Sequence, residues 1–273
     1  LITNRAKRDP KRIVFAEADH LDVLKAAQIV HEDGIGIPVL LGNKETILEL
    51  KEEISFDAEV EIIDPKTKEE EERRNRYATT YWETRKRKGT TYLDAQKWMR
   101  ERNYFAAMMV NKGEADALVT GYSRSYPSNV KPMMELIEKA PGVTRIATTN
   151  MMMTKRGPIF LADTAINPNP TADDLAKIAL MTAKTVRMFG MEPVIAMVSF
   201  SNFGSSDNES ALKIRKAVAF LHENYPDLIV DGEVQSDFAL NPELISSKFP
   251  FSKIANKKVN TLVFPNLDAA NIT

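Results

Sequence analysis

Residues 119–132 read Val-Thr-Gly-Tyr-Ser-Arg-Ser-Tyr-Pro-Ser-Asn-Val-Lys-Pro and join a predicted strand, Ala115–Val119, to a predicted helix, Asn129–Lys139. The loop between the two elements is rich in small, hydroxyl and cationic residues. Free backbone N–H groups, hydroxyls and the positive end of a following helix attract oxyanions such as phosphate. The stretch therefore predicts a strand, an anion-binding loop and a helix, which is the repeating unit of an α/β fold.

Apolar strands and helical patterns alternate along the whole chain, which is typical of βαβ units around mostly parallel sheets. The helix-breaking sequence at residues 140–142, Ala-Pro-Gly, predicts a boundary between two α/β lobes, residues 1–140 and 141–273. The chain ends just after a strand and turn of the kind that leads into a helix, so we expect further C-terminal helices beyond it. The predicted strands are Arg12–Ala16, Pro38–Leu41, Glu59–Ile63, Ala117–Val119, Arg145–Thr149, Pro158–Ala162, Val194–Val198, Leu228–Val230 and Thr261–Phe264.

The helical regions are predicted with similar detail. A long one spans residues 67–112 with an interruption near Gly89, and another follows Pro170, where Thr171 and Asp174 have the spacing of a capping box. The alternating charges of residues 66–76 indicate a solvated helix face. The other predicted helices are Leu21–Asp33, a helix after the Gly-Asn-Lys turn at residues 42–44, and Glu209–Asn224.

Composition narrows the class of protein. The 273 residues are 43% apolar and 27% charged, which is typical of a globular domain. The absence of cysteine excludes disulfides, thiolate metal ligands and cysteine nucleophiles. A formal net charge of −1 does not favour nucleic-acid binding, and no window is apolar enough for a membrane span or a secretory signal. We therefore expect a cytoplasmic protein that binds neither nucleic acid nor membranes.

Two further segments have the composition of phosphate sites. Residues 199–207, Ser-Phe-Ser-Asn-Phe-Gly-Ser-Ser-Asp, follow a predicted strand and precede a helix, as the first loop does. Residues 85–89, Arg-Lys-Arg-Lys-Gly, concentrate four positive charges that suit a pyrophosphate. Both patterns also occur as helix caps and solvated helix ends. A divalent cation is conceivable only if the fold gathers Asp163, Asp231 and Asp237, and the three histidines are too far apart in the sequence to suggest a metal site.

Several motifs carry a family resemblance that extends over nearly the whole chain. Residues 12–17 (Arg-Ile-Val-Phe-Ala-Glu) and 165–171 (Ala-Ile-Asn-Pro-Asn-Pro-Thr) are two of them, and residues 85–91 match the pattern R-K-x-K-G-x-T. Residues 226–232 and 263–271 complete the set. With these motifs the chain resembles the phosphate acetyl/butyryltransferase family, and within it the transferase-like C-terminal domain of bacterial hybrid malic enzymes.

The resemblance implies a two-lobed, mostly parallel α/β fold of the isocitrate/isopropylmalate-dehydrogenase-like type that forms a homodimer or a higher homo-oligomer. It also implies that acetyl-CoA binds between the lobes and that the acetyl group passes to phosphate. The residues expected to contact acetyl-CoA or phosphate are Arg85, Lys86, Lys88, Thr120, Gly121, Arg124, Ser125, Lys131, Ser199, Ser201 and Gly204.

The sequence also departs from the transferase pattern. Arg124 stands where the family usually has histidine, and Lys131 stands where it has an arginine associated with phosphate. The family's N-D-L-S-R-G motif, with its catalytic serine, arginine and aspartate, is not among these residues, so we assign no catalytic residue and no metal ligand. Residues 199–204 and 231–233, together with Asp237, are most similar to the malic-enzyme branch.

We therefore favour a regulatory domain that binds acetyl-CoA as an effector and lacks transferase activity, in an NADP-dependent decarboxylating malic enzyme. NADP and a divalent metal would then belong to an N-terminal dehydrogenase domain outside this sequence. The alternative is an active phosphate acetyltransferase. A metal-dependent hydroxyacid dehydrogenase of similar fold is a third reading, but no cofactor or substrate motif supports it.

Overall fold

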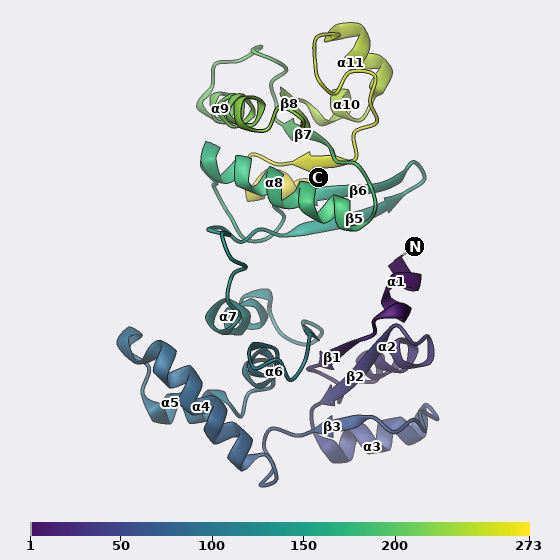
Figure 1. The fold of residues 1–273 in the computed structure, drawn as a ribbon, viewed down its shortest axis with the longest axis vertical. Coiled ribbons are helices and arrows are strands. Elements are labelled where there is room, and N and C mark those ends of the chain that lie inside the picture. The colour runs from purple at the N-terminus through teal and green to yellow at the C-terminus, as the bar shows by residue number, and fades with distance from the viewer. Residues whose placement is uncertain (1) are drawn as a thin grey trace. The chain divides into compact units, whose positions relative to one another are not determined.

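A four-stranded parallel sheet forms the centre of the N-terminal unit, with the strand order β3-β2-β1-β4. The computed structural model describes residues 2–273, and the chain divides between Ala140 and Pro141 into two compact units (Figure 1). The strands of this unit are β1 (Lys11–Phe15), β2 (Gly36–Leu41), β3 (Glu61–Ile63) and β4 (Ala117–Val119). Its helices are α1 (Ile2–Arg8), α2 (Leu21–Glu32), α3 (Lys44–Glu53), α4 (Glu71–Arg85), α5 (Tyr92–Trp98), α6 (Arg102–Asn111) and α7 (Tyr126–Leu136), with a 3-10 turn η1 at Lys86–Lys88.

Both faces of this sheet are covered by helices. Because successive side chains of a strand point to opposite faces, Val14 and Ala16 join the core formed with α4, α5 and α6, whereas Phe15 packs with α2 and α3. The inner side chains Leu24 of α2 and Phe105 of α6 are fully buried. A parallel sheet covered in this way leaves its carboxyl edge open for ligands.

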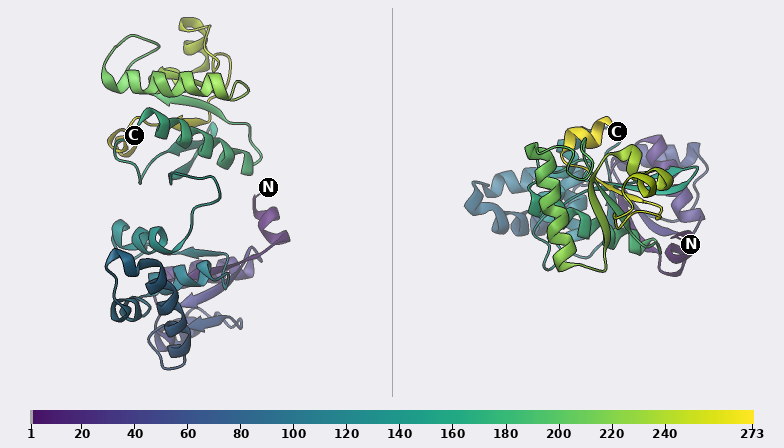
Figure 2. Two further views of the ribbon diagram at one scale, coloured as in Figure 1. Left: turned by 60° about the vertical axis from the view of Figure 1, so that its left-hand side comes forward. Right: turned by 90° about the horizontal axis from the view of Figure 1, so that it is seen from above.

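The C-terminal unit is built on a five-stranded sheet with the order β5-β6-β9-β7-β8. Its helices also cover both faces, with α8 and α9 side by side on one face (Figure 2) and α10 and α11 on the other. The strands are β5 (Thr149–Thr154), β6 (Gly157–Ala162), β7 (Val194–Val198), β8 (Ile229–Val234) and β9 (Thr261–Val263); the helices are α8 (Ala172–Met188), α9 (Glu209–Asn224), α10 (Ser236–Ala239), α11 (Pro242–Lys248) and α12 (Leu267–Ile272). The predicted α/β class with mostly parallel sheets is confirmed.

One strand differs from the prediction. A strand was expected at residues 145–149, but β5 covers residues 149–154 and pairs antiparallel with β6 through a two-residue turn. The hydroxyl of Thr154 donates to the Gly157 carbonyl at 2.7 Å and accepts from the Arg156 N–H at 3.1 Å, which closes the turn. Most of β5 is exposed, and its three methionines are consecutive in the sequence. The segment therefore lacks the alternation of apolar and polar side chains that predicts a strand.

The structure refines two predictions for the helical part of the first unit. Residues 67–112 form α4, η1, α5 and α6, with the predicted break at Gly89. The charged run 66–76 is not only a solvated face, because Arg74 is buried and donates to the Pro65 carbonyl at 2.7 Å.

The predicted capping box of the second unit is confirmed, since Thr171 and Asp174 exchange both hydrogen bonds at the start of α8.

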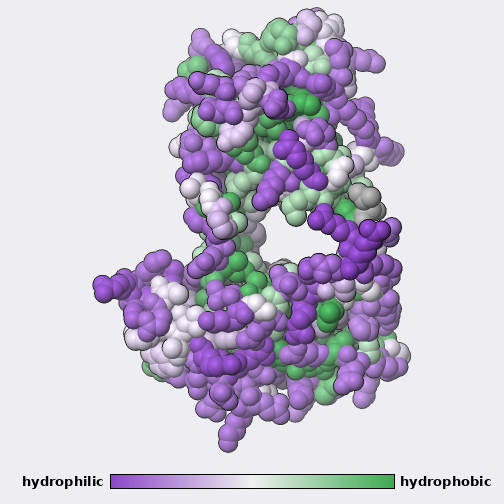
Figure 3. Space-filling view, in the orientation of Figure 1, coloured by the Kyte–Doolittle hydropathy of each residue, from purple (hydrophilic) through white to green (hydrophobic). Residues whose placement is uncertain are grey.

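The surface of each unit is mainly polar. Figure 3 shows hydrophilic side chains over most of the visible face of both units. Among residues 2–273, no helix is long and apolar enough to cross a membrane.

Candidate anion-binding site

The loop after β4 is held by one buried carboxylate. The backbone N–H groups of Gly121 and Tyr122 donate to Glu17 Oε1 at 2.9 and 3.2 Å, and the N–H of Ser123 donates to Glu17 Oε2 at 2.7 Å. Gly121 adopts a φ of 117°, a conformation that favours glycine. The Thr120 hydroxyl lies 3.0 Å from the same carboxylate. The expectation that these backbone N–H groups are free to bind phosphate is therefore wrong.

The surroundings of Glu17 favour its ionised form. Burial alone raises the pKa of this carboxyl group, but the hydrogen bonds from Ser123, Gly121 and Thr120 outweigh burial and lower the pKa to about 2. The loop is thus stabilised around a negative charge, and its shape is fixed before any ligand binds.

We expect the free energy of unfolding to fall as the pH drops from 4.5, the ordinary pKa of this carboxyl group, to about 2. In that window the unfolded chain protonates Glu17 while the folded chain does not, so protonation favours unfolding. Glu17→Gln removes the titrating group. Urea unfolding at about pH 5 and about pH 3 should show a smaller loss of stability in Glu17→Gln than in the parent protein. Equal losses would mean that other carboxylates account for the acid sensitivity.

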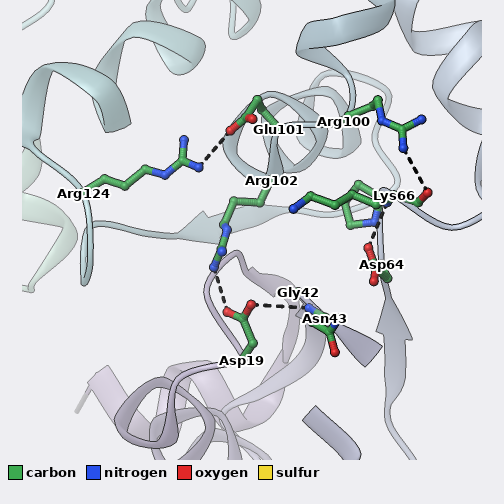
Figure 4. Close-up of a pocket in the computed structure, with 10 residues that line it drawn as sticks. Asp19, Gly42, Asn43, Asp64, Lys66, Arg100, Glu101, Arg102 and Arg124 are labelled. Carbon is green, nitrogen blue, oxygen red and sulfur yellow. Dashed lines mark hydrogen bonds and ion pairs between the residues drawn. The ribbon is translucent and has the colours of Figure 1, made fainter. Parts of the chain in front are cut away.

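A small cavity lies at the carboxyl edge of the first sheet, where the turns that follow its strands meet (Figure 4). Asp19 follows β1, Gly42 follows β2, Asp64 and Lys66 follow β3, and Arg124 comes from the loop after β4. The cavity volume is about 80 Å³. Drug-sized ligands occupy pockets of roughly 300–1,000 Å³, so this cavity is too small for one of them and suits a single oxyanion.

Two of the cations in this cavity are held by carboxylates. Arg102 Nη1 lies 2.7 Å from Asp19 Oδ1, and Arg124 Nη2 lies 2.9 Å from Glu101 Oε2. Figure 4 shows Arg124 extending to Glu101 and Arg102 extending to Asp19. The carboxylates therefore fix the two guanidinium groups in position.

The other two cations lack such partners. Within residues 2–273, neither Lys66 nor Arg100 forms an ion pair, and Arg100 only donates to the Lys66 carbonyl at 3.4 Å. Arg100 also lies near Arg74, whose pKa is lowered first by burial and then by the charge of Arg100. Closely spaced cations that form no ion pair are stabilised by a bound anion. Lys66 and Arg100 therefore make this cavity a candidate anion-binding site.

An apolar pocket lies on the other side of the same loop. Its volume is about 310 Å³, and Phe15, Val23, Val119 and Tyr122 are among the residues that line it. Within the N-terminal unit, the loop after β4 thus contributes to a polar cavity and to an apolar pocket. This pairing suits a ligand that has both a phosphate group and an apolar portion.

Arg85 and Lys131, predicted as ligand residues, belong to a second cluster in which α4, α6 and α7 meet. Arg85 Nη2 lies 2.8 Å from Glu135 Oε1, and the Tyr104 hydroxyl donates to Glu135 Oε2 at 2.8 Å. The ring of Tyr104 stacks on Trp98, and the Lys131 ammonium group lies 5.5 Å from the Trp98 ring centre. Arg85 is therefore held by Glu135, whereas Lys131 is exposed and lies near the Trp98 ring.

The remaining candidates of the first unit have different surroundings. Lys86 pairs with Glu83, Lys88 is exposed at the end of η1, and the hydroxyls of Ser125 and Ser128 lie 2.9 Å apart. These positions do not line the small cavity. Their contact with acetyl-CoA stays a prediction.

The loop after β7 repeats the arrangement of the first loop. Glu233, which is 0% exposed, accepts from the Ser201 hydroxyl at 3.0 Å and from the Gly204 N–H at 2.8 Å. Its charge is balanced by Arg215, whose Nε lies 3.0 Å from Glu233 Oε2. The Ser199 hydroxyl accepts from the Ser201 N–H at 3.2 Å. The hydrogen-bonding groups of Ser201 and Gly204 are therefore occupied, and the role of all three residues as ligands stays a prediction.

The three aspartates considered for a metal ion serve other purposes. Asp163 accepts the backbone N–H of Thr148 at 3.0 Å and that of Asn167 at 2.8 Å. Asp231 accepts the Ser252 hydroxyl at 2.7 Å, and Asp237 is exposed on α10. Within residues 2–273 no group of three or more histidines, aspartates or glutamates is placed to hold a metal ion.

Sequence reasoning did not select Lys66, Arg100 or Arg102. Lys66 follows a predicted strand, so the rule that ligands bind beyond the carboxyl ends of parallel strands points to it. Arg100 lies between α5 and α6 and Arg102 begins α6, both far from any strand end in the sequence, and only the fold brings them to the cavity.

Sequence comparison assigns the chain to a family. The family model described as phosphate acetyl/butaryl transferase matches residues 1–273. The chain belongs to this family. It is 38% identical to the phosphate acetyltransferase of Thermoanaerobacterium thermosaccharolyticum over 99% of this chain and 83% of the relative. The resemblance predicted from the motifs is thus confirmed.

Members of the phosphate acetyl/butaryl transferase family also include longer proteins. The chain is 35% identical to the NADP-dependent malic enzyme of Escherichia coli, of which it covers 36%. Among solved structures, it matches a phosphotransacetylase from Streptococcus pyogenes with a TM-score of 0.87 and 34% identity, covering 99% of this chain and 83% of that one. The EutD phosphotransacetylase from Staphylococcus aureus gives a TM-score of 0.85 with 33% identity and the same coverage. The expected α/β fold is therefore that of phosphotransacetylases.

Proposed function

We propose that this protein is a phosphate acyltransferase that moves an acetyl group from acetyl-CoA to inorganic phosphate. The observation that carries the proposal is a cation-lined cavity at the carboxyl edge of a parallel sheet, in a chain that is 38% identical to a phosphate acetyltransferase over 99% of its length. In this reaction a phosphate oxygen attacks the thioester carbonyl carbon. The C–O bond forms, the C–S bond breaks, and coenzyme A leaves as a thiol after it takes up a proton.

The cavity supports the binding of a phosphate group. Its size admits one oxyanion, and Lys66 and Arg100 supply positive charge that no carboxylate in the described chain neutralises by an ion pair. Arg102 and Arg124 supply guanidinium groups already oriented by Asp19 and Glu101. Groups held in place before the reaction stabilise charge without having to reorganise.

The apolar pocket supports the binding of the rest of the substrate. Acetyl-CoA joins its phosphates to the thioester through a long arm with apolar portions. The pocket lined by Val23 and Tyr122 offers apolar surface beside the loop that carries Arg124. Anionic and apolar recognition within one unit suits this mixed ligand.

A second candidate function is regulatory, with acetyl-CoA as an effector of a malic enzyme. The 35% identity to the malic enzyme of Escherichia coli over the whole chain favours this function. The chain matches only part of that longer protein, as a regulatory domain would. The lysine at position 131 also favours it, since the ammonium group lies against Trp98 and lacks the planar fork with which arginine binds phosphate. In this case an N-terminal dehydrogenase domain would use NADP and a divalent metal.

One assay separates the two functions. The full-length protein is given acetyl-CoA and phosphate, and acetyl phosphate formation is measured together with acetyl-CoA affinity. Turnover in the usual range of roughly 1–10³ s⁻¹ establishes the transferase. Binding without turnover, with inhibition of malate decarboxylation, establishes the regulatory function. If the protein showed no acetyl-CoA binding and no turnover, both functions would be rejected.

Charge reversal at Arg100 should weaken acetyl-CoA or phosphate binding at least about tenfold, because a charge-assisted hydrogen bond contributes about 1.5–3 kcal/mol. Arg100 is exposed, so Arg100→Glu should leave the fold intact. Lys25→Glu is the matched control, since Lys25 is an exposed cation of α2 outside the cavity. Calorimetric titration of both variants provides the measurement. Equal affinities in the two variants would show that the cavity does not bind the ligand.

A further inference from the structure

A second groove lies in the C-terminal unit, at the edge of its sheet where the parallel strands begin. Two adjoining hollows of about 950 and 420 Å³ meet there and share Arg156, Pro158 and Lys258. The first residues of β7 and β8, Val194 and Ile229, line the smaller hollow. The Ser201 loop, by contrast, follows the carboxyl end of β7 and lies at the opposite edge of the sheet. The groove is therefore separate from the Ser201 loop.

Cations outnumber acids along this groove. Lys155 and Arg156 form the turn between β5 and β6, which projects from the sheet in Figure 1, and Lys257 and Lys258 precede β9. All four are exposed, and in residues 2–273 none of them forms an ion pair. Because the whole chain has a net charge of −1, this excess of positive charge is local.

Few acids line the groove, so most of its positive charge is uncompensated. Glu192 and Glu243 are the carboxylates in the lining. Glu192 is already 3.4 Å from Arg187, a residue outside the groove. A basic groove of this kind attracts anions with several charges, such as a chain of phosphates.

The turn that carries two of the cations is held rigidly. The hydrogen bonds of Thr154 close it, as described above. The Lys258 ammonium group donates to the Arg156 carbonyl, and the Arg156 guanidinium lies 3.5 Å from the Leu240 carbonyl. These contacts bring β5–β6, β9 and α10 together around the groove. Cations positioned in advance bind an anion at a smaller entropic cost.

The groove also has apolar surface. Pro158 and Ile159 at the start of β6, Leu240 after α10, and Val259 before β9 line the larger hollow. Its volume lies at the upper end of the range for small-molecule sites, roughly 300–1,000 Å³. We propose that this groove binds a nucleoside polyphosphate, with the phosphate chain on the cations of the β5–β6 turn and the base on the apolar residues.

The test is calorimetric titration of ATP, and separately of inorganic pyrophosphate, into the full-length protein. ATP should bind at least about tenfold more tightly than pyrophosphate, because only ATP also contacts the apolar residues. The double variant Arg156→Glu with Lys258→Glu should weaken ATP binding at least about tenfold, and added salt should weaken it in the parent. Lys184→Glu, which changes an exposed cation of α8 outside the groove, should alter affinity less than about twofold.

Two further comparisons make the result decisive. The milder pair Arg156→Gln with Lys258→Gln removes the two positive charges without adding negative ones, so weaker binding there reflects the lost cations and not repulsion by new carboxylates. ATP affinity that falls in Arg100→Glu but not in the groove variants would place ATP in the first unit and overturn the proposal. No ATP binding at millimolar concentration, or equal affinity for ATP and pyrophosphate, would overturn it as well. Acetyl-CoA affinity should respond only to Arg100→Glu, which keeps this test independent of the proposed function.

Discussion

Replacing Glu233 by alanine should lower the free energy of unfolding by about 3 kcal/mol, because the Ser201 hydroxyl and the Gly204 N–H lose their acceptor and each polar group left unpaired costs about 1–3 kcal/mol. Glu233 is completely buried and accepts hydrogen bonds from Arg215, Ser201 and Gly204. Without the carboxylate, the guanidinium loses its main counter-charge, and the hydroxyl and amide lose their acceptor. Equilibrium denaturation in urea gives the measurement.

The matched control for this change is Asp207→Ala. Asp207 also pairs with Arg215, at 3.1 Å, but its side chain is 85% exposed. Surface ion pairs contribute about 0–1 kcal/mol, so this variant should be nearly as stable as the parent. If both variants lost the same amount, the effect would come from the loss of a counter-charge to Arg215 and not from the buried network.

The second large effect is expected at Glu135, where alanine should lower the free energy of unfolding by about 3 kcal/mol, since each buried polar group left unpaired costs about 1–3 kcal/mol. The carboxylate accepts from the hydroxyls of Tyr81 and Tyr104, both at 2.8 Å, and from Arg85. Burial first, and then the bond to Glu135, raises the pKa of Tyr81 to about 12. The hydroxyls therefore remain protonated donors.

A double-mutant cycle tests this assignment directly. Tyr104→Phe removes one donor while keeping the ring that stacks on Trp98. The combined variant with Glu135→Ala should lose less stability than the sum of the single losses, because the two residues share one interaction. Glu138→Ala, which changes an exposed acid just after the end of α7, should change stability by less than about 0.5 kcal/mol. Strict additivity in the cycle would contradict the proposed contact.

Much of the fold could be predicted from local patterns in the sequence. Apolar runs such as Val194–Val198 end in small or polar residues, and the capping box at Thr171 marks a helix start. Strand β5 was placed wrongly because its side chains are exposed and its pairing depends on a short turn. Propensity and pattern do not reveal pairing with a neighbouring strand when neither face of the strand is fully buried.

The candidate site was only partly predictable for a different reason. The loop that holds Gly121 and Arg124 was identified from its composition, as a strand-end loop. Its backbone N–H groups donate to the carboxylate of Glu17, more than 100 residues earlier in the chain, and sequence spacing gives no sign of this contact. Arg100 reaches the cavity only because α5 and α6 pack against the sheet.

The carboxylate beneath the loop after β4 also affects the thermodynamics of binding. Ordering the backbone of one residue costs about 1–2 kcal/mol of conformational entropy. Glu17 orders residues 121–123 through their backbone N–H groups, so the chain loses this freedom when it folds. A ligand that contacts Arg124 therefore binds to a loop that is already ordered. Its affinity depends on the contacts that it makes, because binding carries no entropic cost of ordering residues 121–123.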